Sequence, residues 1–316
     1  EKYVVTWALG HLVTLADPEE YSKDYKEWKM EVLPMMPKPM KLMVIQKTAK
    51  QYRAVKEQMF RKDIAEIIIA TDAGREGELV ARWILEKAGC RKPIKRLWIS
   101  SVTDKAIREG FAKLCDGRKY NDLYDAAVSR AEADWLVGIN ATRALTCKYN
   151  AQLSGGRVQT PTLAMIAKRE EEIRAFRPQE YYGAQVQAGK IKWTWQDQKS
   201  GGFRSFSKER IENISLAVKN ETLSIEKVAK SAKKTYAPGL YDLTELQRDA
   251  NQKFGFSAKE TLNIMQRLYE NHKVLTYPRT DSKYIGTDVV DTLKDRLRAI
   301  SVGPYKKLAG SLVMKP

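Results

Sequence analysis

Residues 64–71 form a strand-like stretch that is apolar on both faces from Ile67 to Ala70, and a glycine-containing acidic turn follows it. A helical pattern comes next, with Leu79, Ile84 and Leu85 on one face, and a second strand-like run lies at 96–99. A strand that is apolar on both faces is typical of a parallel sheet, and two such strands joined by a helix form a βαβ unit. We therefore expect an α/β fold in this part of the chain.

Local signals predict the other elements. The predicted helices cover residues 103–114, 122–149 and 160–175, and a further helical module covers 244–300. Residues 185–187 and 191–195 alternate around a Gly-Lys turn, as the two strands of a hairpin do. The apolar run at 3–7 is strand-like as well, and the lysine-rich stretch at 227–234 is a plausible linker.

These patterns divide the chain into several modules. A length of 316 residues exceeds one domain of about 150 residues. We expect a multidomain fold that combines α/β and α+β parts: an α/β domain at 1–115, a helical module at 116–180, a mostly β module at 181–238 and a helical module at 239–316.

The charge balance restricts the class of partner. The chain has 56 Lys and Arg against 39 Asp and Glu, a formal net charge of +17. This excess favours a polyanionic partner, and charge alone does not choose between nucleic acid and anionic lipid. A membrane-surface role is disfavoured because the basic stretch at 227–234 lacks the bulky apolar face of a membrane-binding helix. No run approaches the ~20 apolar residues of a membrane span.

The cysteine pattern limits metal and redox chemistry. Three cysteines lie far apart without a Cys-x-x-Cys pair, and the chain has only two histidines. This composition argues against a zinc site and a disulfide framework, and it favours a reducing, intracellular compartment.

The first chemical motif is the acidic turn Asp72-Ala73-Gly74-Arg75-Glu76-Gly77-Glu78, which lies between the predicted buried strand and the helix. Ligands bind at the carboxyl ends of strands in open α/β sheets. Asp72 and Glu76 are hard oxygen ligands of the kind that Mg²⁺ takes beside a phosphate. The alternative is a surface turn whose acids favour the positive end of a helix dipole.

The second motif is Tyr277-Pro278-Arg279-Thr280-Asp281-Ser282. Tyr277 can act as a covalent nucleophile, and Arg279 can stabilise charge that develops on a phosphate. The alternative is a partly buried structural tyrosine beside a turn.

The third motif is Ser154-Gly155-Gly156-Arg157-Val158-Gln159, just before a predicted helix start. Its glycines, guanidinium and amide can reach a phosphate together, with a helix N-terminus close by. The alternative is a flexible linker.

Together, these motifs resemble the catalytic core of the type IA DNA topoisomerases, most closely the topoisomerase III group. They stand in the family's order, and other stretches agree with it: Gly10 to Leu12, Leu33-Pro34, Arg130 to Trp135, Gly138 to Arg143 and Leu243 to Gln247. The resemblance covers essentially the whole chain, and the motifs are highly specific in combination. It implies a Toprim α/β domain joined to helical and β modules that form part of a toroid around DNA.

The resemblance also implies residue roles. Tyr277 would attack a phosphodiester and become linked to the 5′-phosphate, and Arg279 would assist at the scissile phosphate. Asp72, Glu76 and Glu78 would form the Mg²⁺-binding cluster, with Glu76 also catalytic. The implied DNA contacts are Ser154, Gly155, Gly156, Arg157, Val158, Gln159, Arg143, Arg130, Asp134, Trp135, Trp28 and Arg279. One strand would be cut, another passed and the first resealed without ATP, in the cytoplasm at the nucleoid, and a helicase is a candidate partner.

Two departures from the family pattern affect these expectations. Gly74 stands where much of the family has a second Asp, so one metal ligand is missing or replaced by water. The family's first Toprim strand should precede Glu1, and only 39 residues follow Tyr277. We therefore expect a truncated chain, in which activity and ring closure are reduced or lost.

Two other functions fit parts of the sequence. A Toprim-type nuclease or primase fragment would use Asp72 and Glu76 without Tyr277, and it would form no covalent adduct with DNA. A non-catalytic module that binds single-stranded DNA would need only the basic charge and aromatics such as Trp193 and Trp195. Such a module would require no Mg²⁺ and would tolerate substitution of Tyr277.

Overall fold

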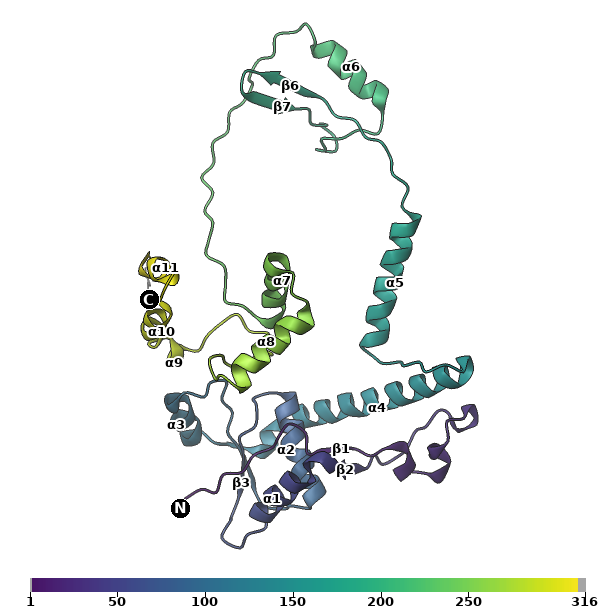
Figure 1. The fold of residues 1–316 in the computed structure, drawn as a ribbon, viewed down its shortest axis with the longest axis vertical. Coiled ribbons are helices and arrows are strands. Elements are labelled where there is room, and N and C mark those ends of the chain that lie inside the picture. Colours follow the sequence, from purple (N-terminus) through teal and green to yellow (C-terminus); the bar gives the residue numbers. More distant parts are fainter. Residues whose placement is uncertain (1, 312–316) are drawn as a thin grey trace. The chain divides into compact units, whose positions relative to one another are not determined.

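The structure is a computed structural model that describes residues 2–311 (Figure 1). The chain forms two compact units, Glu1–Gln159 with Pro238–Pro316, and Thr160–Ala237. This division differs from the four expected modules, because the helical module at 116–180 is split between the two units. Its long first helix packs on the α/β domain, whereas nearly all of its second helix belongs to the unit that carries the hairpin.

The α/β domain is built on the predicted βαβ unit. Strand β3 (Ile67–Ile69) runs parallel to β4 (Ile94–Arg96), and helix α2 (Arg75–Ala88) joins them. Strand β5 (Cys115–Asp116) pairs antiparallel with β4, which gives the sheet order β3-β4-β5. The parallel pair confirms the α/β prediction. The second strand lies at 94–96 rather than 96–99, because its partner β3 ends at Ile69, which is in register with Arg96.

A second sheet and two helices complete the core of this domain. Strand β1 (Val13–Leu15) pairs antiparallel with β2 (Leu42–Val44), and helix α1 (Ala49–Met59) follows. One cluster of buried side chains joins these elements to β3, α2 and α4: Leu12, Val13, Leu15, Tyr52, Val55, Met59, Ile69, Leu79, Trp83, Ile84, Leu85, Ala88 and Ala127. The acidic turn is therefore anchored at both ends in a packed core.

The segment before β1 and the segment between β1 and β2 are irregular. The expected strand at 3–7 does not form, and the Trp7 carbonyl there accepts a hydrogen bond from the Gln51 side chain rather than from a neighbouring strand (2.7 Å). Three short 3-10 helices lie between β1 and β2, namely η1 (Pro18–Glu20), η2 (Lys23–Lys26) and η3 (Met30–Val32). A fourth, η4 (Gln46–Thr48), lies between β2 and α1.

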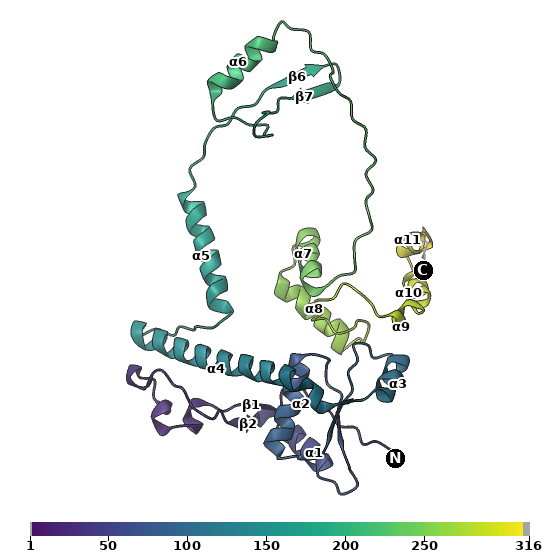
Figure 2. The ribbon, with the colours of Figure 1, turned by 180° about the vertical axis from the view of Figure 1, so that it is seen from behind.

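Two helices follow the βαβ unit as predicted. Helix α3 (Asp104–Ala112) begins at Thr103, whose hydroxyl accepts a hydrogen bond from the Ala106 amide (3.2 Å). A short 3-10 helix, η5 (Gly117–Tyr120), leads into α4 (Asn121–Tyr149), which has 29 residues and packs against α2 (Figure 2).

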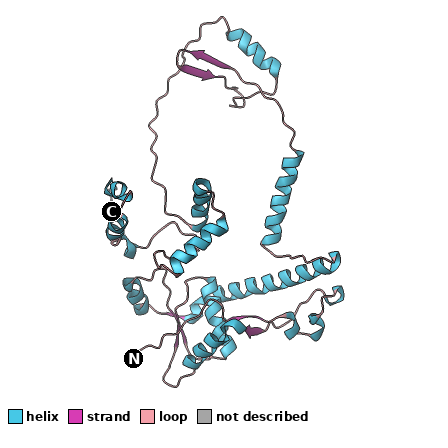
Figure 3. Ribbon diagram, in the orientation of Figure 1, coloured by secondary structure: helices cyan, strands magenta, loops and turns pink. Residues whose placement is uncertain are grey.

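The second unit holds helix α5 (Gln159–Ala175), the hairpin and helix α6 (Lys208–Val218). Strands β6 (Gln185–Ala188) and β7 (Ile191–Thr194) pair antiparallel, which confirms the predicted hairpin (Figure 3). Gly189 in its turn has a φ of +60°, a left-handed conformation that favours glycine. The unit is less β-rich than expected, because these two strands are its only paired elements besides one isolated bridge within residues 160–237.

The C-terminal part is helical, as predicted. Its helices are α7 (Leu243–Phe254), α8 (Ala258–Glu270), α9 (Thr287–Val290), α10 (Leu293–Ile300) and α11 (Tyr305–Ser311). Asp242 and Ser257 cap α7 and α8 through their side chains. The loop between α8 and α9 carries Tyr277. None of the helices within residues 2–311 combines the length and the apolar character needed to cross a membrane.

Candidate active site

The acidic turn begins where the chain leaves β3. A Cβ atom at position 77 would collide with the Asp72 carbonyl oxygen and lie 2.9 Å from the carbonyl carbon, so this close approach requires glycine. The Thr71 hydroxyl donates to the Gly77 carbonyl (2.7 Å) and closes the turn over the first residues of α2. The Asp72 side chain is exposed, and no hydrogen bond or ion pair holds its carboxylate within residues 2–311.

Glu76 lies in the first turn of α2 and faces two basic side chains. Its Oε1 accepts a hydrogen bond from Arg130 Nη1 (3.0 Å), and its Oε2 lies 3.6 Å from His11 Nε2. The Glu76 side chain is more than half exposed. It is therefore open to an ion or a phosphate that competes with these partners.

Glu78 was expected to bind Mg²⁺, and its position in the structure does not fit that role. Its side chain is fully buried, with Oε1 accepting from Arg82 Nε (2.8 Å) and Oε2 accepting from Arg96 Nε (2.9 Å). Both oxygens are used by guanidinium groups, so Glu78 is not placed to bind a metal ion. Sequence reasoning missed Arg82 and Arg96, although an arginine at the start of the otherwise apolar run 96–99 was a signal for a buried partner.

The remaining carboxylates suit a magnesium ion. Asp72 and Glu76 are both exposed at the carboxyl end of β3, and Mg²⁺ binds through one or two carboxylates while it keeps several waters. Within residues 2–311 no group of three or more His, Cys, Asp and Glu side chains gathers into a metal site. The donor set thus fits a hydrated Mg²⁺ and does not form an all-protein cage.

A line of charged side chains runs along α4 from the acidic turn to the glycine motif. Arg130 pairs with Glu76, its Nε lies 3.9 Å from Asp134 Oδ2, and Asp134 Oδ1 accepts from Arg157 Nε (2.6 Å). The hydrogen bond from Arg157 lowers the pKa of the Asp134 carboxyl below its usual value. We call these four residues the α4 charge line.

The glycine motif is held against α4 by main-chain contacts. The Gly155 amide donates to Thr142 Oγ1 (3.0 Å), which donates to the Gly155 carbonyl (3.3 Å). A Cβ at position 155 would lie 2.8 Å from the Ala141 Cβ, so only glycine allows this approach. Gln159 Nε2 donates to Ser154 Oγ (3.3 Å), which closes the motif at the start of α5. This docking does not match the alternative of a flexible linker.

Two of the expected DNA contacts, Arg143 and Trp135, donate hydrogen bonds to main-chain carbonyls inside the protein. Arg143 is buried, its Nη1 donates to the Tyr25 carbonyl (2.6 Å), and its guanidinium lies over the Trp28 ring at 5.2 Å. Burial lowers the pKa of Arg143, and the residue holds the segment of Trp28 rather than facing solvent. Trp135 is half-buried and donates from Nε1 to the Ala16 carbonyl (3.0 Å). Trp28 itself remains half exposed.

Tyr277 lies in the loop after α8, with 49% of its surface exposed. Its ring meets Tyr269 edge-on at 5.8 Å, and the next residue, Pro278, is fully buried. Arg279 is exposed, and within the described chain no hydrogen bond or ion pair occupies it. The Thr280 carbonyl accepts from the Leu243 amide (3.0 Å), which ties this loop to the start of α7. No interaction among residues 2–311 joins Tyr277 or Arg279 to the acidic turn.

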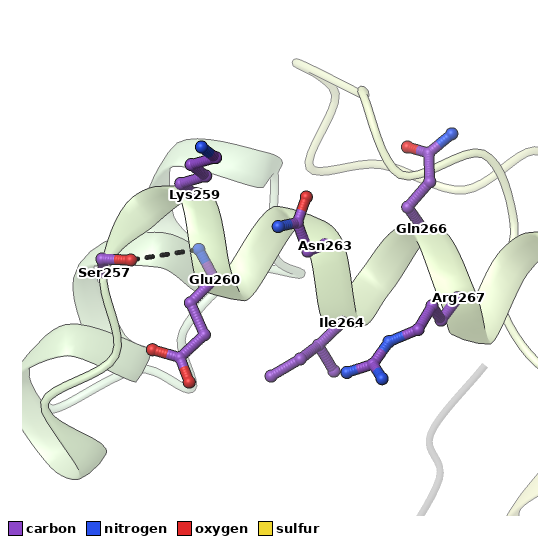
Figure 4. A pocket seen from close by; sticks show the side chains of 7 residues that line it. All are labelled: Ser257, Lys259, Glu260, Asn263, Ile264, Gln266 and Arg267. Carbon is purple, nitrogen blue, oxygen red and sulfur yellow. Dashed lines mark hydrogen bonds between the residues drawn. The ribbon is translucent and has the colours of Figure 1, made fainter.

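A hollow of about 630 Å³ lies on α8 (Figure 4). Most of the residues that line it have polar or charged side chains: Ser257, Lys259, Glu260, Asn263, Ile264, Gln266 and Arg267. None of the predicted site residues lines it, so the chemistry of the side chains, rather than the size of a hollow, locates the candidate site.

Comparisons with known proteins agree with this arrangement of motifs. A DNA topoisomerase family model matches residues 118–315, and a Toprim domain model matches residues 1–102. DNA topoisomerase 3 of Bacillus cereus is 62% identical over all 316 residues, and that of Bacillus subtilis is 61% identical over 312. The chain spans only 43% of either relative.

A solved structure supports the same assignment. Full-length topoisomerase I of Thermotoga maritima matches with a TM-score of 0.61 and 26% identity, over 92% of this chain and 48% of that one. The family models, the relatives and the fold agree, and the chain belongs to the DNA topoisomerase family, in its type IA branch.

Proposed function

We propose that this chain supplies the cleavage centre of a type IA topoisomerase, which cuts one DNA strand through Tyr277. The observation that carries the proposal is a half-exposed tyrosine beside an exposed arginine without a partner in the described chain. The buried Pro278 between them fixes the backbone, so the two side chains are held by one anchored loop.

The chemistry is a reversible transesterification. The Tyr277 oxygen forms a bond to phosphorus, the hydroxyl gives up its proton, and the 3′-oxygen of the cut strand leaves and takes up a proton. The 5′-phosphate stays on the tyrosine, so the bond energy is kept and no nucleotide is needed for resealing. The Arg279 guanidinium stabilises the negative charge that grows on the phosphate oxygens.

Asp72 and Glu76 would hold Mg²⁺, which supplies a positive charge that orients the phosphate and the free 3′-hydroxyl. Arg130 and Arg157 of the α4 charge line, with the glycine motif, would bind backbone phosphates, and Trp28 would stack on a base. The substrate would be negatively supercoiled or partly single-stranded DNA. We place the protein at the nucleoid in the cytoplasm because of this substrate, and a helicase remains a candidate partner.

A covalent adduct tests the proposal. The protein is incubated with a 5′-labelled or 3′-labelled single-stranded oligonucleotide, with and without Mg²⁺, and resolved on a denaturing gel. A labelled protein band is expected only with the 3′ label, because that fragment carries the 5′-phosphate. Tyr277→Phe should abolish the band and leave oligonucleotide affinity nearly unchanged. Cleavage without an adduct would favour a Toprim nuclease, and binding without cleavage would favour a single-strand-binding module.

A further inference from the structure

Arg96 is a fully buried cation at the end of β4. Its Nε donates to Glu78 Oε2 (2.9 Å), and its Nη1 donates to the carbonyls of Ile69 (3.1 Å), Thr71 (2.8 Å) and Leu97 (2.9 Å). Its Nη2 donates to the Asp72 carbonyl (2.6 Å). All of its donor nitrogens are therefore used, most of them on the main chain where β3 ends.

The stability of the fold does not by itself explain why a charged arginine is buried at position 96. Removing a charge from water is costly, and well-packed apolar residues usually stabilise a core at least as well as a buried ion pair does. An apolar side chain at position 96, however, would leave the carbonyls of Thr71 and Asp72 without these donors. What the guanidinium adds is a fixed direction, because its planar fork engages several acceptors at once.

The hydrogen bonds of Arg96 engage the two peptide groups on either side of the Asp72 Cα. They hold the carbonyls of Thr71 and Asp72, while Gly77 presses against the Asp72 carbonyl from α2. Asp72 is thereby held between β4 and α2, although its own carboxylate is exposed and has no partner among residues 2–311.

We propose that Arg96, held by Glu78, is a positioning residue that orients Asp72 for Mg²⁺. This inference rests on the proposed function of Asp72 as a metal ligand. Arg96 itself touches neither the ion nor DNA; it fixes the backbone from which the Asp72 carboxylate extends. Groups that orient a metal ligand in this way usually change metal affinity when they are replaced.

Arg82 provides a matched control. It pairs with the other oxygen of Glu78 and is also largely buried, but its remaining donors bind Asn121 Oδ1 (2.8 Å) and the Gly117 carbonyl (2.6 Å). Arg82 thus shares the same carboxylate without touching the Asp72 turn. A purely structural network would respond in the same way to replacement of either arginine.

The experiment compares Arg96→Lys with Arg82→Lys in the whole protein. Mg²⁺ binding is measured by calorimetry without DNA, oligonucleotide binding is measured without Mg²⁺, and thermal unfolding is recorded for each variant. We expect Arg96→Lys to raise the dissociation constant for Mg²⁺ about tenfold, in the lower range for such outer groups. Arg82→Lys should change it less than about twofold at a similar loss of melting temperature, and neither should change oligonucleotide affinity.

Two further arrangements keep the test decisive. If the Arg96→Lys protein does not fold, the double variant Arg96→Gln/Glu78→Gln is used instead, because it removes both charges of this ion pair at once. It should show the same loss of Mg²⁺ affinity. In an Asp72→Asn background, Arg96→Lys should cause no further loss. Equal effects of the two arginine variants, an unchanged affinity in Arg96→Lys, or no Mg²⁺ binding by the parent would each overturn the inference. Absence of the tyrosine adduct would instead overturn the proposed cleavage, because calorimetry does not depend on it.

Discussion

Replacing Gly77 by alanine tests how the acidic turn is built. Position 77 lies in the first turn of α2, where alanine is a better helix former than glycine. The added methyl group would nevertheless collide with the Asp72 carbonyl, so the turn has to move by roughly 1 Å to reach ordinary contact distances.

The size of the effect follows from three contributions. Forcing a group into this packed site costs about 1–3 kcal/mol. The shift also breaks the hydrogen bond from Arg96 to the Asp72 carbonyl, which costs about 1.5–3 kcal/mol for a charged donor. The better helix propensity of alanine returns about 1 kcal/mol. We therefore expect a net loss of about 1.5–5 kcal/mol in the free energy of unfolding, out of a usual total of about 5–15 kcal/mol.

Thermal unfolding of Gly77→Ala should show a melting temperature lower by roughly 5–15 °C for a unit of this size. Gly74→Ala is the matched control, because a Cβ there meets no atom within 4 Å and its φ of −176° is open to any residue. That control loses only the difference between glycine and alanine at a helix N-cap, below about 1 kcal/mol. A Gly77→Ala protein that melts together with the Gly74→Ala protein would refute the close packing of the turn.

The other predictions concern DNA, metal and pH. Arg279→Ala should lower the single-turnover cleavage rate at saturating DNA by roughly 100-fold or more, and Arg279→Lys should recover part of it; a loss confined to Kd would show that Arg279 only grips DNA. Asp72→Ala should weaken Mg²⁺-dependent religation more than cleavage or DNA binding, and equal religation by variant and parent across a Mg²⁺ titration would exclude its role as a ligand. The log–log slope of single-strand affinity against salt should be about −0.7 for each neutralised phosphate, and Arg157→Ala should make the slope shallower by about that amount; an affinity independent of salt would separate the +17 charge from DNA binding. Because the pKa of Asp134 is lowered in the folded state, its stabilising contribution is complete above the unfolded pKa of about 3.9 and is lost as the pH falls through the folded value. The difference in melting temperature between the protein and Asp134→Asn should therefore disappear in acid, and a difference that persists unchanged to low pH would contradict this assignment.

Local signals in the sequence were enough for much of the fold. The buried run before Asp72 predicted the parallel pair of β3 and β4, and Thr103 predicted the start of α3. The hairpin of β6 and β7 could be located because its two-residue Gly-Lys turn and the alternation of side chains on either side of it are both local sequence signals. The apolar run at 3–7 gave the same strand signal, but a strand needs a neighbour, and neighbours far along the chain leave no local signal.

The site shows the same limit. The spacing of residues in the motifs singled out Asp72, Glu76 and the glycine motif. Their roles in binding Mg²⁺ and DNA remain predictions. Glu78 was misassigned because its partner Arg96 lies 18 residues away, on a strand that reaches it only in the folded sheet. An acid in a first helical turn looks the same in the sequence whether it faces solvent or a buried guanidinium.

Helix α4 binds two neighbouring segments through their main chain. Asn140 Oδ1 accepts a hydrogen bond from the Met35 amide (2.6 Å), and Asn140 Nδ2 donates to the Met35 carbonyl (2.9 Å). The Thr142 hydroxyl likewise bonds both the amide and the carbonyl of Gly155. Arg143 donates to the Tyr25 carbonyl. Contacts of this kind do not read the identity of the bound side chain. The hydrogen bonds to positions 25 and 35 therefore do not select the side chains there: packing alone constrains the fully buried Met35, and proline is excluded at 35 because it lacks the N–H donor. A change at 140, 142 or 143, by contrast, removes an anchor that no single substitution in the bound segment can restore.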